Sequence, residues 1–338
     1  MSNNKAIKVV FFHRKPWPEK NFSIESQFDF LRENLPSDIH PEVKVMQFFS
    51  KGILKRLYIM VEALLSQGQV NHITGDINFI ALLLPRRRTV LTIHDLGFMN
   101  HRNPVARFIL KWLWIKLPVW RCGIITTVSE KTKAELLRYV DINPSKIHVI
   151  YVPISPRFVT APKVFNREEP VILQIGTKYN KNVKRLLQAL EGVRCRLELI
   201  GKADRSLLIQ LESSKIKYRI SVNLSDKEMQ QMYIDADVVS FISTNEGFGM
   251  PIVEANATGR VVVTSNISSM PEVAGQAAHL VNPFDVASIR TGIQKVIEDT
   301  DYRESLIARG LLNRQRFNVE GIAEKYAMVY RSLAREGN

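Results

Sequence analysis

Two glutamates, Glu246 and Glu254, stand eight positions apart in the stretch EGFGMPIVEA, residues 246–255. Carboxylates can accept hydrogen bonds from the hydroxyls of sugars. Between them, the segment Gly247–Met250 leads into Pro251, which suits the first turn of a helix because no N–H bond is needed there. The N–H groups at a helix start favour an anion such as a diphosphate. The stretch therefore suits a nucleotide sugar, although a strand–turn–helix with ordinary surface acids would give the same pattern.

The elements around this stretch can be predicted from hydrophobic periodicity. Residues 238–243 form an apolar run typical of a buried strand, and Ser225 with Glu228 forms a capping box that begins the preceding helix. Gly259 is placed to end the helix that Pro251 begins. Because ligands bind outside the carboxyl ends of strands in open α/β sheets, this order places both glutamates at a binding crevice.

The same alternation of apolar runs and helical patterns extends along the whole chain of 338 residues. It predicts parallel sheets with helices on both faces, in two domains of about 150 residues each. A proline-containing segment, 153–170, is predicted to be the linker between them. We therefore expect an α/β chain with two doubly wound, Rossmann-like domains that face each other across a cleft. The predicted strands are residues 7–12, 43–48, 89–94, 123–128, 146–151, 171–175, 197–200, 238–243, 261–264 and 279–281.

The net charge of +14 is concentrated in the first half of the chain. Residues 1–160 carry 23 Lys and Arg against 12 Asp and Glu, whereas residues 161–338 carry 24 against 21. A basic domain predicts an acidic partner, which would be nucleic acid, anionic lipid or a phosphorylated substrate. The two cysteines, Cys122 and Cys195, have no metal-binding spacing, so we expect a reducing compartment and no metal site. Because we find no signal peptide and no apolar run long enough to span a bilayer, we expect a cytoplasmic protein.

Residues 104–121, PVARFILKWLWIKLPVWR, combine aromatic and basic side chains. Such a segment suits an anionic membrane surface, and Arg86–Arg88 would suit lipid phosphates. For residues 104–121 themselves, we favour a different interpretation: a helix that is buried on one side and whose lysines extend to solvent. For the first domain as a whole, we expect a surface that binds the inner (cytoplasmic) face of an anionic membrane.

Taken together, these motifs resemble the retaining GT-B glycosyltransferases of glycosyltransferase family 4. The stretch from Glu246 to Glu254 matches the family's two glutamates separated by seven residues. Several motifs in the same order are more specific than any single one, and they cover most of the chain. The other segments that resemble the family are HITGD (72–76), TVLTIHD (89–95), VSEKTKAEL (128–136), KIHVIYVP (146–153), ILQIGTKYNKN (172–182), SDKEMQQMYIDADVVSFISTNEGFGMPIVEANATG (225–259) and SSMPEVAG (268–275).

The resemblance implies a hexosyltransferase that moves a hexose from a nucleoside-diphosphate sugar to a glycan or lipid-linked glycan, as in polysaccharide or lipopolysaccharide synthesis. It implies an acceptor-binding domain at residues 1–155, a linker at 156–169 and a nucleotide-sugar-binding domain at 170–317. A C-terminal helix at 318–338 would cross back to the first domain.

The resemblance also implies roles for individual residues. Glu246 would hold the donor hexose and stabilise charge at the reacting carbon, and His94 would face the same sugar from the other domain. Attack would occur on the same face, assisted by the leaving phosphate. No metal or other cofactor is implied, because Lys181 and helix-start N–H groups would neutralise the diphosphate while Glu254 binds the ribose. The donor-binding residues implied are Gly176, Thr177, Lys181, Gly247, Phe248, Gly249, Met250 and Glu254.

Two departures from the family pattern affect the expected site. An arginine often follows the glycine of the phosphate-binding strand, whereas Thr177 and then Lys178 stand there in this chain. The family's glycine-rich loop after the first strand is replaced by FHRKPWPEKNFSIES (12–26). In that segment the candidates for the acceptor side are Arg14, Ser23 and Glu25.

Other functions stay open on the sequence alone. A sugar phosphorylase or a nucleotide-sugar epimerase could use the same fold, although no acid/base residues for an epimerase can be placed. A basic nucleic-acid-binding protein would fit the charge, but no helix-turn-helix, aromatic RNA-binding platform or zinc finger is evident, so we expect no nucleic acid partner. Asp235 and Asp237 form a D-x-D pattern typical of a metal site in another glycosyltransferase fold, but here they are predicted to end a helix.

Overall fold

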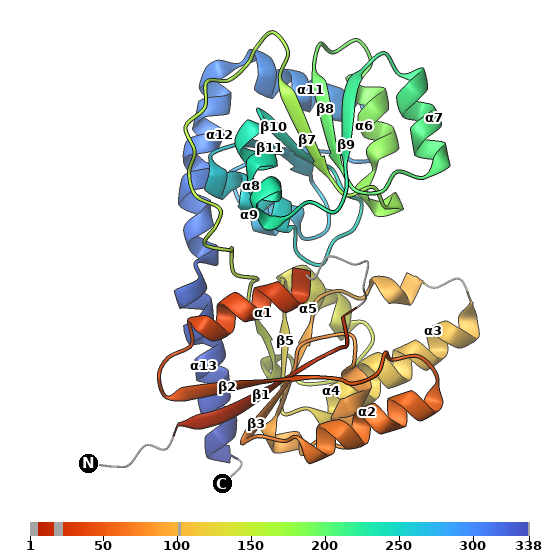
Figure 1. Ribbon diagram of the computed structural model, residues 1–338, viewed down its shortest axis with the longest axis vertical. Coiled ribbons are helices and arrows are strands. Elements are labelled where there is room, and N and C mark those ends of the chain that lie inside the picture. The colour runs from red at the N-terminus through yellow and green to blue at the C-terminus, as the bar shows by residue number, and fades with distance from the viewer. Residues whose placement is uncertain (1–5, 17–22, 101–102, 337–338) are drawn as a thin grey trace. The chain divides into compact units, whose positions relative to one another are not determined.

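The computed structural model describes residues 6–16, 23–100 and 103–336, and the chain divides into two compact units (Figure 1). Unit 1 comprises Met1–Pro153 and Val319–Asn338, and unit 2 comprises Ile154–Asn318. Each unit contains a six-stranded parallel sheet flanked by helices. The predicted α/β architecture with two doubly wound sheets is confirmed.

The sheet of unit 1 has the strand order β2-β1-β3-β4-β5-β6. Its strands are β1 (Ile7–His13), β2 (Ile39–Val45), β3 (Val70–Ile73), β4 (Thr89–Ile93), β5 (Ile124–Thr127) and β6 (Ile147–Val149). Its helices are α1 (Ser23–Glu33), α2 (Ile53–Leu65), η1 (Asn78–Leu82), η2 (Arg86–Arg88), η3 (Gly97–Asn100), α3 (Pro104–Leu110), the π-helical η4 (Lys111–Lys116), α4 (Leu117–Arg121), α5 (Glu130–Leu137), η5 (Pro144–Lys146) and α13 (Val319–Glu336).

Alternate side chains of β1 enter two different apolar layers. Val10 belongs to the buried cluster that contains Ile59 of α2. Phe11 points to the opposite face, where its ring centroid lies 6.2 Å from that of Phe28 on α1 and 6.0 Å from that of Tyr330 on α13. Because side chains alternate along a strand, both faces of the sheet are thereby covered.

The last helix, α13, is held in unit 1 by polar contacts as well as by packing. His72 of β3 is fully buried, with Nδ1 2.8 Å from the Tyr330 hydroxyl and Nε2 2.7 Å from Oγ1 of Thr92. Arg331 donates to both carboxylate oxygens of Asp38, at 2.7 and 2.8 Å. Burial lowers the pKa of His72 well below its ordinary value, so the ring is neutral at physiological pH.

The sheet of unit 2 has the order β12-β11-β10-β7-β8-β9. Its strands are β7 (Val171–Ile175), β8 (Arg196–Ile200), β9 (Lys217–Ser221), β10 (Val238–Phe241), β11 (Val261–Ser265) and β12 (His279–Val281). Its helices are η6 (Tyr179–Lys181), α6 (Val183–Leu190), α7 (Arg205–Ser213), α8 (Asp226–Asp235), α9 (Met250–Thr258), α10 (Met270–Ala274), α11 (Val286–Glu298), α12 (Thr300–Asn313) and η7 (Arg314–Phe317).

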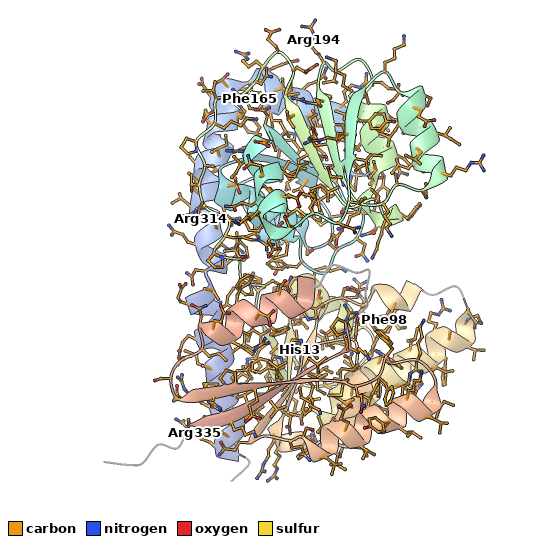
Figure 2. The ribbon with its side chains drawn as sticks, viewed as in Figure 1. His13, Phe98, Phe165, Arg194, Arg314 and Arg335 are labelled. Carbon is orange, nitrogen blue, oxygen red and sulfur yellow. The ribbon has the colours of Figure 1, made fainter. Side chains whose placement is uncertain are left out.

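The segment between Pro153 and β7 has no regular secondary structure, yet it packs closely on unit 2. Phe158 is 4% exposed and lies edge-on to the Tyr233 ring at 5.2 Å. Phe165 (Figure 2) lies beneath the guanidinium of Arg303, 3.9 Å from the ring centroid. The segment is therefore anchored to unit 2 along its length.

Three strand predictions were wrong or missing. The second strand was predicted at 43–48 but occupies Ile39–Val45, an edge position with mostly exposed side chains. The strand β9, KYRIS, is an edge strand of the sheet in unit 2. It was not predicted, because an edge strand needs no apolar run. The strand β3, VNHI, was missed because buried Asn71 and His72 interrupt its apolar pattern.

Candidate active site

The strand order of unit 2 reverses between β7 and β10. These strands pair in parallel, with β8 on the far side of β7 and β11 on the far side of β10. The chain therefore leaves their carboxyl ends in opposite directions, which opens a crevice at this point of the sheet. The loop 176–182 and the loop 242–249 border it, and α9 begins from the second loop. Together they carry every donor-binding residue expected from the sequence.

Lys181 and Glu246 form an ion pair between these two loops. The Lys181 ammonium lies 2.7 Å from Oε1 of Glu246, and Asn180 Nδ2 donates to the same oxygen at 3.0 Å. Both charged side chains are largely buried, at 19% and 17% exposure. The ammonium also lies 4.7 Å above the centre of the Phe241 ring, within cation–π range. Because an ammonium has three N–H donors, Lys181 can hold Glu246 and bind an anion at the same time.

Gly176 leaves the space that the Lys181 side chain occupies. Its φ of +87° is in the left-handed region that favours glycine. A Cβ atom at Gly176 would lie 3.0 Å from both Cγ and Cε of Lys181. The lysine could then keep its position only if the loop shifted. The glycine therefore contributes to the placement of the ammonium.

Two neighbouring serines hold the backbone of the second loop. Ser268 Oγ accepts from the Glu246 N–H at 3.1 Å and donates to the Glu246 carbonyl at 2.9 Å. Ser269 Oγ donates to the Phe248 carbonyl at 2.5 Å. Ser268 itself has a φ of +63°, an uncommon conformation for a residue with a side chain. The SSMPEVAG segment therefore fixes the position of Glu246 through the main chain.

The start of α9 lies at the carboxyl end of β10. Gly249 precedes the helix with a φ of +124°, and Pro251 stands in its first turn. The Phe248 side chain is 6% exposed and lies edge-on to Phe317 at 5.6 Å, so only its backbone is presented to the crevice. The positive end of the helix dipole and its first N–H groups favour an anion near Met250.

Glu254 lies on α9, one turn into the helix, and accepts a hydrogen bond from the Tyr233 hydroxyl of α8. Burial raises the pKa of Glu254, although the hydrogen bond from Tyr233 and the charges of Arg157 and Lys181 act in the opposite direction. Burial also raises the pKa of Tyr233 well above its ordinary value, so the phenol stays a hydrogen-bond donor. Tyr233 thereby fixes one carboxylate oxygen, Oε2, of Glu254.

Thr177 points toward a neighbouring loop of unit 2. Its Oγ1 donates to the Lys202 carbonyl at 2.6 Å, and a Cβ at Gly201 would lie 3.1 Å from that oxygen. Thr177 therefore joins the loops after β7 and β8. The exposed Lys178 follows it, where a second cation could be supplied.

Unit 1 has its own reversal of strand order, between β1 and β3. Arg14, just after β1, forms an ion pair with Asp76, just after β3. His94 follows β4, and its Nε2 donates to the Thr74 carbonyl at 2.7 Å, so Nε2 carries a hydrogen. Gly75 has a φ of +141°, and a Cβ there would lie 3.1 Å from the His94 ring. Arg14, Asp76 and His94 thus gather at the carboxyl ends of the unit 1 strands.

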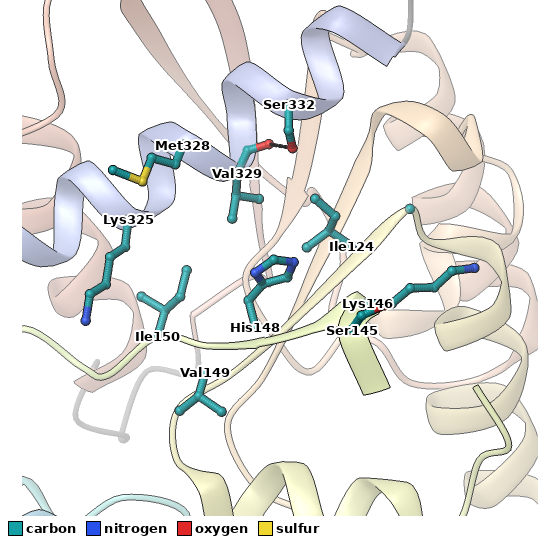
Figure 3. A pocket seen from close by; sticks show the side chains of 11 residues that line it. Ile124, Ser145, Lys146, His148, Val149, Ile150, Lys325, Met328, Val329 and Ser332 are labelled. Carbon is teal, nitrogen blue, oxygen red and sulfur yellow. Dashed lines mark hydrogen bonds between the residues drawn. The ribbon is translucent and has the colours of Figure 1, made fainter. Parts of the chain in front are cut away.

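The other two acceptor-side candidates, Ser23 and Glu25, fall at the start of α1, and their side chains lie outside the described residues. A groove of about 660 Å³ occurs elsewhere in unit 1, between β6 and α13 (Figure 3). Lys146, His148 and Lys325 line it, and His94 and Arg14 do not. The groove is therefore separate from the residues gathered at the carboxyl ends of the strands.

Comparisons with known proteins agree with this geometry. The model for Glycosyltransferase Family 4 matches residues 38–158, and the model for Glycosyl transferases group 1 matches residues 158–312. The O-antigen chain mannosyltransferase B of Escherichia coli is 30% identical over 277 residues, which are 74% of this chain and 72% of that protein. The chain belongs to the GT-B glycosyltransferases. A second relative of this chain is the MMP alpha-(1->4)-mannosyltransferase of Mycolicibacterium hassiacum. It is 27% identical over 256 residues, which are 71% of this chain and 58% of that protein.

A solved structure supports the GT-B fold of this glycosyltransferase. The crystal structure of Anabaena Alr3699/HepE in complex with UDP and glucose superimposes with a TM-score of 0.77. The match covers 96% of this chain and all of that chain, at 17% sequence identity. At that identity the similarity establishes the fold alone, and the activity rests on the family models and the mannosyltransferase relatives.

The D-x-D pattern of the glycosyltransferase has a structural role. The α8 helix ends at Asp235, as predicted. The Asp237 side chain is fully buried and accepts from the backbone N–H of Val171 at 2.8 Å and of Asn166 at 3.1 Å, while Lys163 Nζ lies 2.7 Å away. Within residues 6–16, 23–100 and 103–336, no group of three or more His, Cys, Asp or Glu side chains could hold a metal ion. Over the same residues, no helix is both long enough and apolar enough to cross a membrane.

Sequence reasoning missed four residues that position the site of the glycosyltransferase. Asn180 contacts Glu246 directly, Ser268 and Ser269 hold its loop, and Tyr233 fixes Glu254. Asn180 adjoins Lys181 in the chain, and Ser268 and Ser269 begin the SSMPEVAG motif. These motifs could therefore have identified all three residues as candidates. The contact of Tyr233 with Glu254 depends on how α8 packs against α9, which periodicity does not specify.

Proposed function

We propose that this chain is a retaining, metal-independent hexosyltransferase of glycosyltransferase family 4. It transfers a hexose from a nucleoside-diphosphate sugar to a glycan or lipid-linked glycan in polysaccharide or lipopolysaccharide synthesis. The observation that carries the proposal is the Lys181–Glu246 pair, which lies beside the start of α9 where the strand order of unit 2 reverses. A cation, a helix N-terminus and a carboxylate at one crevice suit a diphosphate joined to a sugar.

In the proposed reaction, the bond between C1 of the hexose and the β-phosphate oxygen breaks. Negative charge then collects on the diphosphate, where Lys181 and the N–H groups at the start of α9 stabilise it. Positive charge collects at C1, where the Glu246 carboxylate opposes it. The acceptor hydroxyl bonds to C1 on the same face, and its proton passes to the leaving phosphate oxygen. The products are a glycoside with the donor's anomeric configuration and a nucleoside diphosphate.

The remaining assignments follow from the same resemblance and geometry. Glu254 binds the ribose of the donor, with its second oxygen held by Tyr233. His94 contacts the donor hexose, and Arg14 with Asp76 contributes to the acceptor side. We propose mannose as the hexose because two relatives are named mannosyltransferases, and we propose action at the inner face of a membrane, since one of them is named for O-antigen chains.

A donor panel tests this proposal. Mannose and glucose donors carrying UDP, GDP or dTDP are incubated with a lipid-linked glycan acceptor in the presence of EDTA. We expect release of nucleoside diphosphate and a product with retained configuration by NMR. An inverted product would exclude the retaining mechanism, and a dependence on divalent cations would exclude the metal-free one. A reaction that needs inorganic phosphate would indicate a phosphorylase, and a changed sugar without acceptor would indicate an epimerase.

A further inference from the structure

Residues 157–161 pack on the helices α8 and α9 of unit 2, and we call them the anchor segment. Phe158 is 4% exposed, and the centroid of its ring lies 5.2 Å from that of Tyr233 on α8, with an angle of 80° between the rings. The Arg157 carbonyl accepts a hydrogen bond from Gln230 Nε2, also on α8, at 2.6 Å. Since edge-to-face rings attract each other, the Phe158 ring and the Tyr233 ring fix each other's orientation.

The anchor segment also holds the carboxyl end of α9. Thr160 Oγ1 donates to the Ala257 carbonyl at 3.3 Å, and the Ala161 N–H donates to the Thr258 carbonyl at 3.3 Å. Carbonyls in the last turn of a helix have no partner within the helix, so these bonds satisfy groups that would otherwise need water. The anchor segment therefore joins α8 to α9.

A buried arginine joins the same two helices by further hydrogen bonds. Arg260 is 4% exposed, and its Nε donates to the Tyr233 carbonyl at 3.0 Å. Its other nitrogens donate to the Ile234 carbonyl at 2.9 Å and to the Thr258 carbonyl at 3.1 Å. The backbone of Tyr233 is thus held by Arg260, and the orientation of its ring is left to the packing with Phe158.

The hydrogen bond from the Tyr233 hydroxyl to Oε2 of Glu254 links this packing to the candidate active site. The Tyr233 side chain is fully buried between the anchor segment and α9. Because the hydroxyl stands at the far end of the ring from the backbone, a small tilt of the ring moves it away from the carboxylate, and a hydrogen bond weakens steeply as its angle falls. Phe158 therefore controls how well Tyr233 holds Glu254.

We propose that the anchor segment sets the affinity of the glycosyltransferase for the ribose of its donor. Phe158 acts as a positioning residue: it orients Tyr233, which holds the Glu254 carboxylate where it can accept hydrogen bonds from the ribose hydroxyls. The inference rests on the ribose role of Glu254 in the proposed function. If the segment served stability alone, Phe158 would be equivalent to Phe165 (Figure 2), which anchors the same stretch of chain against Arg303 of α12.

Calorimetric titration of the full chain with UDP and GDP, each in its ribose form and its 2′,3′-dideoxyribose form, tests the positioning role. For the base that binds more tightly, we expect the original chain to prefer ribose by at least about tenfold, because the dideoxy form cannot donate to the charged Glu254. Phe158→Leu keeps an apolar side chain but removes the ring. It should reduce the preference to about threefold or less and leave the Kd of the dideoxy form unchanged. Phe165→Leu, the matched control, should keep the full preference.

A second variant tests the route through Tyr233 without disturbing the packing. Tyr233→Phe keeps the ring and removes the hydroxyl, so it should reduce the ribose preference as far as Phe158→Leu does, and the double variant should reduce it no further. A further loss in the double variant, or a full ribose preference in Phe158→Leu, would overturn this inference while the proposed function stands. Equal binding of ribose and dideoxyribose by the original chain would instead remove the ribose role of Glu254 and this inference with it. No binding of either nucleotide would contradict both the inference and the proposed function as a whole.

Discussion

At the scale of single residues, the proposed chemistry depends on one carboxylate. Glu246 receives two hydrogen bonds, from Lys181 and Asn180, and its backbone is held by Ser268. Such a group is already placed before the donor arrives, so little reorganisation is needed when charge develops at the reacting carbon. The carboxylate charge, rather than its shape, is therefore the property to test.

Replacing Glu246 by glutamine should separate charge from shape. Glu246→Gln keeps the size and the acceptor oxygen but removes the negative charge. We expect kcat to fall by about 10² or more while the donor Kd changes only a few-fold. Glu191→Gln, on an exposed residue of the same unit, serves as the control. A variant that keeps the kcat of the original chain would remove Glu246 from the mechanism.

Glu254 should make the stability of the protein depend on pH. Burial raises the pKa of its carboxyl above the ordinary 4.5. The stabilisation from the protonated form is therefore present below the ordinary pKa and is lost as pH rises through the folded-state pKa. Relative to Glu254→Gln, the original chain should lose free energy of unfolding between about pH 4 and about pH 7. Urea unfolding of both proteins at the two pH values measures this, and a constant difference would contradict the raised pKa.

At the scale of elements, the loop after β7 places the ammonium of Lys181. Gly176 and Gly192 both have positive φ, +87° and +78°. A Cβ would meet Lys181 at Gly176, whereas nothing lies within 4 Å at Gly192. Both glycine-to-alanine variants should lose about 1 kcal/mol of stability from backbone strain. Only Gly176→Ala should also weaken donor binding by calorimetry, and equal binding by both variants would show that Gly176 does not position the lysine.

The aspartates at the end of α8 can be distinguished by a similar comparison. Asp237 is buried and accepts three hydrogen bonds or ion contacts, whereas Asp235 is exposed. Asp237→Ala should cost about 3 kcal/mol of unfolding free energy, because Lys163 and two N–H groups lose their partner. Asp235→Ala should cost within about 0.5 kcal/mol. If both variants instead kept full stability and lost a divalent-cation-dependent activity, the D-x-D pattern would be a metal site.

The elements that could be predicted from the sequence were those with a clear apolar pattern or a capping motif. Buried strands such as β10 and β11 were predicted because their apolar runs are continuous, and the capping box of Ser225 marked the start of α8. The edge strand β9 and the inner strand β3 were not predicted, and the edge strand β2 was misplaced, because exposed or buried polar residues remove the apolar signal. Lys181, Glu246 and Glu254 were predicted as site residues because short motifs carry them. Tyr233 was not, since its role comes from the packing of two helices.

At the scale of the whole molecule, the two sheets follow different strand orders and carry different chemistry. Unit 2 combines Lys181, Glu246 and the start of α9, which suits a diphosphate and a sugar. Unit 1 is the basic part of the chain, with an exposed apolar helix face and an Arg14–Asp76 pair at its strand ends. We therefore expect variants of Gly176 and Lys181 in unit 2 to change donor affinity.

The most direct measurement is calorimetric titration of a nucleoside-diphosphate sugar into the protein in the presence of EDTA. The original chain should bind the donor without a metal. Lys181→Met should bind at least about tenfold more weakly, because a charge-assisted hydrogen bond to phosphate is lost. Lys184→Met, an equal change of charge at an exposed position of α6, should bind normally. Equal donor affinity for all three proteins, or binding that requires a divalent cation, would contradict the account.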